Sequence, residues 1–136
     1  MIKSNINIKV DTFPDKTKLI KTPDMAAKES DAATVWLTWM YSGDQEMAEL
    51  LFTVKHLKAL GKRVNLLMPY IPNARMDRVH NKNTEVFTLK YFCEFVNNLN
   101  IDRVLVFDPH SDVSTALLDR VEVLSPKGAI RYTVAL

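Results

Sequence analysis

The sequence predicts one α/β domain in which a parallel sheet is flanked by helices. Strand-like and helix-like segments alternate in the order strand, helix, strand, helix, strand. The strand-like segments are almost continuously apolar, which is typical of a parallel sheet covered on both faces. The length of 136 residues suits a single domain of ordinary size, so we assign residues 1–136 to one unit.

The amino-terminal segment predicts a hairpin. Residues 6–10 alternate between apolar and polar side chains and indicate an opening strand. Residues 11–16 have the composition of a turn, and residues 18–21 could form the returning strand. Residues 22–32 are polar and rich in alanine, and they predict no element.

A buried strand and a long helix come next. Residues 34–40 are apolar, β-branched and aromatic, as in a buried strand. Residues 41–44 form a loop that contains good helix-capping residues. The helix that follows ends at Gly61, and its apolar side chains recur at helical spacing: Met47, Leu50, Leu51, Val54, Leu57 and Leu60.

The second half repeats the alternation of strand and helix. Residues 64–68 predict a strand that is broken by Pro69. A helix runs from about Thr84 to Asn98, and residues 104–107 form another apolar strand. From about Ser114 onward we expect a short helix and one or two weak strands. The inward positions of the second helix are Val86, Leu89, Cys93 and Val96.

Composition excludes several classes of protein. The net charge of +2 comes from interleaved acids and bases, so no basic stripe predicts a nucleic-acid partner. No apolar run reaches the length of a membrane span and no secretory signal opens the chain, so we expect a cytoplasmic protein. The single cysteine, Cys93, excludes an internal disulfide and a thiolate metal cluster. Three scattered glycines exclude the glycine-rich nucleotide loops.

Three loops follow the predicted strands, at the edge of the sheet where ligands bind in such folds: 41–44, 69–83 and 108–112. The second loop carries Arg75, Asp77, Arg78, His80 and Lys82, and the third carries Asp108, His110, Ser111 and Asp112. Arginine binds phosphate through two parallel hydrogen bonds, and histidine or aspartate can hold a hydrated magnesium ion. The pattern predicts a site for a magnesium nucleotide or a sugar phosphate. The alternatives are that the arginines are solvated surface charges and that His110 caps a strand end.

Two motifs resemble those of the ribose-phosphate pyrophosphokinases, also called phosphoribosyl pyrophosphate synthetases. Residues 69–78, Pro-Tyr-Ile-Pro-Asn-Ala-Arg-Met-Asp-Arg, are similar to that family's Pro-Tyr-x-x-Tyr-Ala-Arg-Gln-Asp-Arg signature. Residues 102–111 resemble its Asp-Leu-His-Ala strand end at matching spacing. Residues 13–15, Phe-Pro-Asp, resemble its Phe-x-Asp-Gly-Glu element, and Ser125-Pro126 matches a Ser-Pro of the family.

The resemblance implies a phosphoribosyltransferase-like amino-terminal domain of a transferase in nucleotide biosynthesis. The implied reaction moves the β,γ-diphosphoryl group of ATP to the anomeric hydroxyl of ribose 5-phosphate and releases AMP, with Mg²⁺ as cofactor. The implied ATP-binding residues are Arg75, Met76, Asp77, Arg78, Phe13 and Asp15. His110 is the implied catalytic residue and magnesium ligand. Phe13 and Asp15 would reach the adenine of a neighbouring subunit, which implies a homo-oligomer with a shared site.

The departures from the family's pattern support a second interpretation. Met76 replaces a polar glutamine, and residues 79–84 are less basic than the family's corresponding loop, on which its phosphate control depends. The family's chains are also much longer, and their carboxyl-terminal half, which holds the ribose-phosphate loop, has no counterpart here. We therefore expect no turnover by this chain alone. The alternative is a non-catalytic regulatory or assembly homologue.

Overall fold

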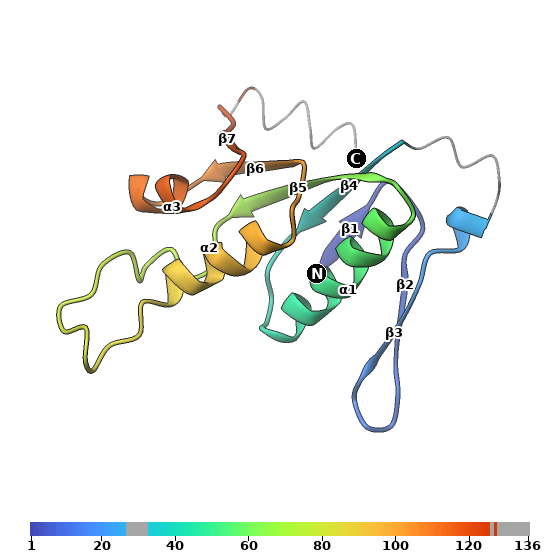
Figure 1. Cartoon of the computed structure of the whole chain (residues 1–136), viewed down its shortest axis with the longest axis horizontal. Coiled ribbons are helices and arrows are strands. Elements are labelled where there is room, and N and C mark those ends of the chain that lie inside the picture. The colour runs from blue at the N-terminus through green and yellow to red at the C-terminus, as the bar shows by residue number, and fades with distance from the viewer. Residues whose placement is uncertain (27–32, 126, 128–136) are drawn as a thin grey trace.

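A five-stranded sheet forms the centre of the computed structural model, which describes residues 1–26, 33–125 and 127 (Figure 1). The strand order is β1-β4-β5-β6-β7. Strands β4 to β7 are parallel, and β1 pairs antiparallel with β4 at one edge. The strands span Ile2–Ser4 (β1), Thr34–Trp39 (β4), Arg63–Tyr70 (β5), Arg103–Asp108 (β6) and Val121–Val123 (β7). The predicted α/β class with a mostly parallel sheet is confirmed.

The described α-helices pack on one face of this sheet. They span Gln45–Ala59 (α1), Thr88–Asn98 (α2) and Asp112–Leu117 (α3). Because β4, β5, β6 and β7 follow one another in space as in sequence, successive right-handed crossovers place their helices on the same side (Figure 1). The expectation of helices on both faces is therefore not met within the described ranges. None of the described helices is long and apolar enough to cross a membrane.

The core lies between this helical layer and the sheet. Alternate residues of β4 point into it, and the buried side of α1 covers them. The core side chains include Val35, Leu37, Trp39, Leu50, Val54, Leu57, Leu66, Phe92 and Val106. Helix α1 ends as predicted at Gly61, whose φ of +77° suits glycine. There the Gly61 and Lys62 N–H groups donate to the Lys58 and Leu57 carbonyls, at 2.9 and 3.0 Å.

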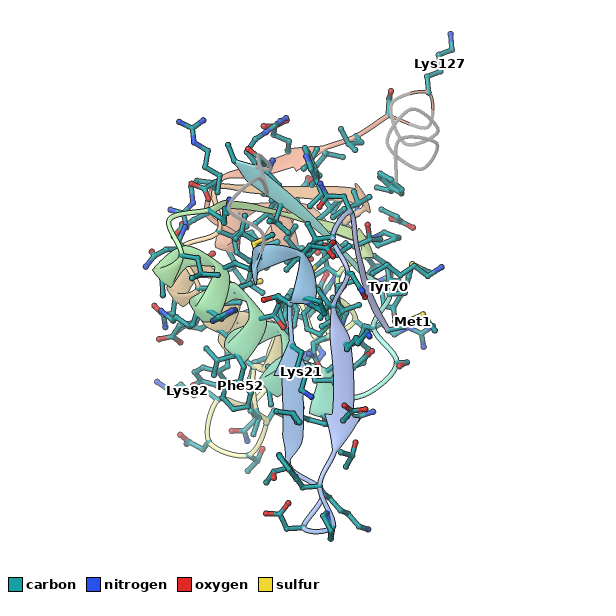
Figure 2. All side chains as sticks on the ribbon, turned by 90° about the vertical axis from the view of Figure 1, so that its right-hand side faces the viewer. Met1, Lys21, Phe52, Tyr70, Lys82 and Lys127 are labelled. Atoms are coloured by element: carbon teal, nitrogen blue, oxygen red, sulfur yellow. The ribbon has the colours of Figure 1, made fainter. Side chains whose placement is uncertain are left out.

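A two-stranded hairpin projects from this body (Figures 1 and 2). It consists of β2 (Lys9–Thr12) and β3 (Lys18–Lys21), so the returning strand is confirmed and the opening strand begins later than residues 6–10 predict. Lys18 pairs with Glu49 of α1 at 3.5 Å, and Thr22 Oγ1 lies 3.2 Å from His56 Nε2. A short 3-10 helix, η1 (Pro23–Ala26), follows in a segment for which the sequence predicts no element.

Several local predictions are wrong. Strand β5 continues through Pro69 to Tyr70 instead of breaking at Pro69. Its pairing with β4 ends at Leu67, so the N–H that Pro69 lacks removes no hydrogen bond to β4. Helix α2 begins at Thr88 instead of Thr84, which leaves Val86 in the preceding loop with 63% of its surface exposed. The weak elements expected after Ser114 are β7 and the helix α3, which begins slightly earlier. Residue 126 of the Ser-Pro match lies outside the described residues.

Candidate functional site

The loops that follow β5 and β6 begin side by side. The two strands are parallel, and Tyr70 at the end of β5 is in register with Asp108 at the end of β6. The first loop carries the arginine motif, and the second is a short turn into α3 that contains His110. Parallel pairing thus brings together two motifs that are about thirty residues apart in the sequence.

A cavity of about 290 Å³ opens between these loops. It is lined by Tyr70, Ile71, Asn73, Ala74, Arg75, Asp108 and His110. Of the predicted site residues, Arg75 and His110 both lie on this cavity, one from each loop. A guanidinium and an imidazole can therefore reach the same bound molecule.

A second hollow of about 410 Å³ adjoins the first, because Arg75 and His110 line both. Its other lining residues are Met76, Asp77, Arg78, His80 and Glu85. All five site residues predicted on these two loops therefore surround one continuous region. The lining of this region combines two arginines and two histidines with the carboxylates of Asp77, Glu85 and Asp108, and its cationic groups can hold a polyanion.

Two residues of the lining adopt a left-handed backbone. Asn73 has φ of 63° and His110 has φ of 62°, conformations that are uncommon outside glycine but favoured by Asn and His among other residues. The turn at Asn73 is closed by the Met76 N–H, which donates to the Asn73 carbonyl at 2.9 Å. The His110 N–H donates to Asp108 Oδ1 at 3.1 Å. These bonds fix the backbone from which Arg75 and His110 project.

The charges of the arginine loop are unequally exposed. Arg78 Nε lies 3.4 Å from Asp77 Oδ1, and the Arg78 side chain is 77% exposed while that of Asp77 is 16% exposed. Partial desolvation would raise the pKa of Asp77, but the Ser111 hydroxyl and the Arg78 guanidinium outweigh it and hold that pKa below its ordinary value. Asp77 is thus a carboxylate at neutral pH, and it orients an arginine that still faces solvent.

The remaining two predicted residues, Phe13 and Asp15, lie elsewhere. They occupy the turn of the projecting hairpin, away from both loops (Figure 1). Phe13 is 47% exposed. The Asp15 carboxylate accepts hydrogen bonds from the Thr17 hydroxyl and N–H, at 2.6 and 3.0 Å, which lower the pKa of Asp15. Within one chain the structure does not bring this turn to the cavity.

The sequence pattern does not identify two residues that line the candidate site, Glu85 and Tyr70. Glu85 accepts a hydrogen bond from the His80 N–H at 2.8 Å and lines the second hollow, but the expected helix start at Thr84 hides it. Tyr70 lines the first cavity and donates its hydroxyl to the Tyr41 carbonyl at 2.7 Å. The Tyr41 hydroxyl in turn donates to Asp44, which raises the pKa of Tyr41 to about 12. The loop of residues 41–44, which follows β4, thereby holds the end of β5 in place.

The protein groups at the cavity fit magnesium only in part. The described residues contain no group of three or more His, Cys, Asp or Glu side chains that could hold a metal ion. His110 and Asp108 do line one cavity, and Mg²⁺ is commonly bound by one or two protein ligands together with substrate phosphates. The donor set suits a magnesium ion that arrives with a phosphate ligand.

Comparisons with known proteins agree with the motifs. No protein-family model matches the chain. A curated ribose-phosphate pyrophosphokinase from Methanobrevibacter smithii is 27% identical over 99 residues, which is 72% of this chain and 32% of that protein. The crystal structure of phosphoribosylpyrophosphate synthetase from Mycobacterium smegmatis matches with a TM-score of 0.69 and 17% identity, over 96% of this chain and 43% of that one. The chain thus spans less than half the length of either protein. It is similar in sequence to ribose-phosphate pyrophosphokinase and has the fold of part of phosphoribosylpyrophosphate synthetase.

Proposed function

We propose that residues 1–136 form one domain, the ATP side of a ribose-phosphate pyrophosphokinase that acts in the cytoplasm. The observation that carries this proposal is the placement of Arg75 and His110 on one cavity at the carboxyl ends of β5 and β6. Ligands bind at this edge in open α/β sheets, and the lining groups suit a polyphosphate. The similarity to ribose-phosphate pyrophosphokinase supports the same assignment.

The proposed roles follow from the exposure and charge of each group. Arg75 and Arg78 bind the phosphates of ATP, Asp77 orients Arg78, and the Met76 side chain contacts the nucleotide. His110 contacts the transferred diphosphoryl group and contributes to holding Mg²⁺ with Asp108. Magnesium, when bound, neutralises phosphate charge. In the transfer, the anomeric hydroxyl of ribose 5-phosphate loses its proton to solvent and its oxygen bonds to the β-phosphorus. The bond between that phosphorus and the oxygen bridging it to the α-phosphorus breaks, and AMP leaves with that oxygen.

Alignment and charge neutralisation are the contributions that this chain can make to such a transfer. Diphosphoryl transfer depends on bringing the two oxygens and the phosphorus into line more than on a covalent intermediate. The described residues around the cavity supply cationic groups but no ribose-phosphate loop of the kind that the family resemblance implies. We therefore expect the chain by itself to bind ATP without releasing AMP.

The hairpin is the part of the chain that we propose to contact a neighbouring copy in a homo-oligomer. Phe13 is exposed on the hairpin turn, which lies away from the cavity of its own chain. The lowered pKa of Asp15 keeps its carboxylate charged on the same turn. In a homo-oligomer the turn would reach the adenine of a neighbouring copy and complete the ATP site. Removing the Phe13 ring should then weaken ATP binding only at protein concentrations at which the chain assembles.

A non-catalytic regulatory or assembly homologue is the second candidate. Met76 lines the second hollow where the family motif has glutamine, so one polar contact to the nucleotide is lost. This candidate predicts that the scaffold persists and that ATP affinity does not depend on Arg75.

Calorimetric titration with magnesium-ATP separates the two candidates. The enzyme proposal predicts heat of binding for the natural chain and a loss of about ten- to a hundred-fold in affinity for Arg75→Ala, the range expected for a charge-assisted hydrogen bond. Lys55→Ala removes the same charge from an exposed position on α1 and should bind like the natural chain. Equal affinity of all three proteins would contradict the proposal, as would AMP release by the chain alone in the presence of ribose 5-phosphate.

A further inference from the structure

The sheet face turned away from the described helices carries a hollow of about 360 Å³. Successive residues of a strand point to opposite faces, so the side chains on this face alternate with the core residues of β4, β5 and β6. This sheet-face hollow shares no lining residue with the proposed ATP site. The described side chains of this face that line it are Lys3, Thr38, Met40, Leu67, Pro69 and Phe107.

Most of the lining of the sheet-face hollow is apolar. Leu67 and Pro69 come from β5, Phe107 comes from β6, and Met40 directly follows β4. Met40 is 46% exposed, so an apolar group bound against it would remove its side chain from water. The volume lies in the range of sites for small molecules, which are typically apolar with a few polar groups that fix the ligand.

The Thr38 hydroxyl is a polar group within this apolar lining. Its Oγ1 atom is buried and has no hydrogen-bond partner among the described residues. Buried hydroxyls nearly always have a partner in folded proteins, so the unpaired group indicates that a ligand completes it. The neighbouring side chains of Lys3 and Met40 are unbranched and exposed, and they can move aside to let a ligand oxygen reach the hydroxyl.

Lys3 supplies a cation next to this hydroxyl. It stands directly opposite Thr38 in the antiparallel pair of β1 and β4, so the two Cβ atoms lie about 5 Å apart on the same face. Within the described ranges the Lys3 ammonium forms no ion pair, and none of the described lining residues is acidic. A hydroxyl and an ammonium at this spacing can bind the two oxygens of one carboxylate.

We propose that the sheet-face hollow binds a small monocarboxylic acid with an apolar body. The apolar body packs against Met40, Leu67 and Phe107, and the carboxylate accepts hydrogen bonds from the Thr38 hydroxyl and the Lys3 ammonium. One cation matches the single charge of a carboxylate, whereas a polyphosphate carries more negative charge than this lining can balance. The proposal does not depend on the proposed ATP site, so either site can be present without the other.

Nuclear magnetic resonance of the chain with ¹³C-labelled methionine methyl groups tests the proposal directly. The probes are hexanoate and, separately, hexanol, at constant ionic strength set with chloride. The Met40 methyl signal should shift and saturate with hexanoate, at an affinity at least about fivefold higher than with hexanol. The methyl signals of Met68, which is buried on the helix face, and of Met76, which lies at the proposed ATP site, should stay in place.

Variants of the same labelled chain show whether the shift arises from the proposed contacts. Thr38→Val keeps the shape of the side chain and should weaken hexanoate binding about tenfold or more, because a hydrogen bond to a charged acceptor is lost. Lys3→Ala should weaken it about two- to fivefold, because the ammonium is exposed to solvent. Lys55→Ala removes an equal charge from exposed α1 and should bind like the natural chain.

Three results would overturn the proposal. The first is the absence of a saturable Met40 shift, or a shift of Met76 in its place. The second is hexanol binding as tightly as hexanoate, which would make the hollow an apolar surface without a carboxylate site. The third is equal hexanoate affinity of Thr38→Val and the natural chain. Valine suits a strand, so the fold should survive this substitution, and an unchanged Met68 signal confirms that it has.

Discussion

Replacing Asp102 by alanine should destabilise the chain because one carboxylate joins three elements. Its oxygen accepts from the Val64 N–H at the start of β5 and from Lys58 near the end of α1, while the Asp102 N–H donates to the Val64 carbonyl at 2.8 Å. Asp102 immediately precedes β6, so this exchange sets the register of β6 against β5.

The magnitude follows from the burial of each partner. Val64 is fully buried, so the change leaves an unpaired N–H and removes a hydrogen bond to a charged acceptor, at a cost of about 1.5–3 kcal/mol. The ion pair with Lys58 adds less than about 1 kcal/mol, because both side chains are about one-third exposed. A total of about 2–3 kcal/mol corresponds to a fall of about 7–10 °C in the melting temperature of a chain of 136 residues.

Chemical and thermal unfolding of three variants provide the assay. Asp102→Asn keeps an acceptor for the Val64 N–H and should cost about 1 kcal/mol, less than Asp102→Ala. Asp119→Ala, which removes an exposed carboxylate, should stay within about 0.5 kcal/mol of the natural chain. If Asp102→Ala and Asp119→Ala unfold at the same denaturant concentration, the assignment of Asp102 as the link between β5 and β6 is wrong.

The pH dependence gives an independent check. Partial desolvation would raise the pKa of Asp102, but the Val64 N–H and the Lys58 ammonium outweigh it and hold that pKa below its ordinary value. A depressed pKa means that the charged form stabilises the fold fully above about pH 5 and that this contribution is lost as the pH falls below about 4. The stability gap between the natural chain and Asp102→Asn should therefore narrow in acid. A gap that widens in acid would contradict the argument.

Three further outcomes are expected. Cys93 is buried, which raises the pKa of its thiol to about 11. A thiol reagent at pH 8 should therefore modify Cys93 only as fast as the chain unfolds, and rapid modification would refute its core position. Gly61→Ala should cost about 1 kcal/mol in denaturant unfolding because of the positive φ, although no atom lies within 4 Å of the added carbon; an unchanged midpoint would show that α1 ends differently. Leu50→Ala should cost about 2–5 kcal/mol, against less than about 0.5 kcal/mol for Phe13→Ala on the exposed turn; equal losses would contradict the assigned core.

The elements that the sequence predicts well are those whose signals are local. Strands β4, β5 and β6 are continuous apolar runs, and α1 has both helical spacing and a glycine stop, so each is found within a few residues. Strand β1 has no such signal, since its three residues become a strand only by pairing with β4. The start of α2 is misplaced because Val86 fits the helical spacing although the chain leaves it exposed in the loop.

The candidate site likewise contains residues that the sequence predicts and residues that it does not. Arg75 and His110 are placed together by the rule that parallel strands end at one edge, and that rule needs only the order of the elements. Glu85 is not predicted, because the helix expected from Thr84 hides its place in the loop before α2, where it accepts a hydrogen bond from the His80 N–H.

The central claim is that the loops after β5 and β6 form one nucleotide site, and a magnesium-ATP titration of the ¹⁵N-labelled chain tests it most directly. The backbone amides of Arg75 and His110 should shift together and yield the same dissociation constant, with Arg75→Ala weakening the response at both. Shifts confined to one loop, or different dissociation constants for the two, would contradict a shared site.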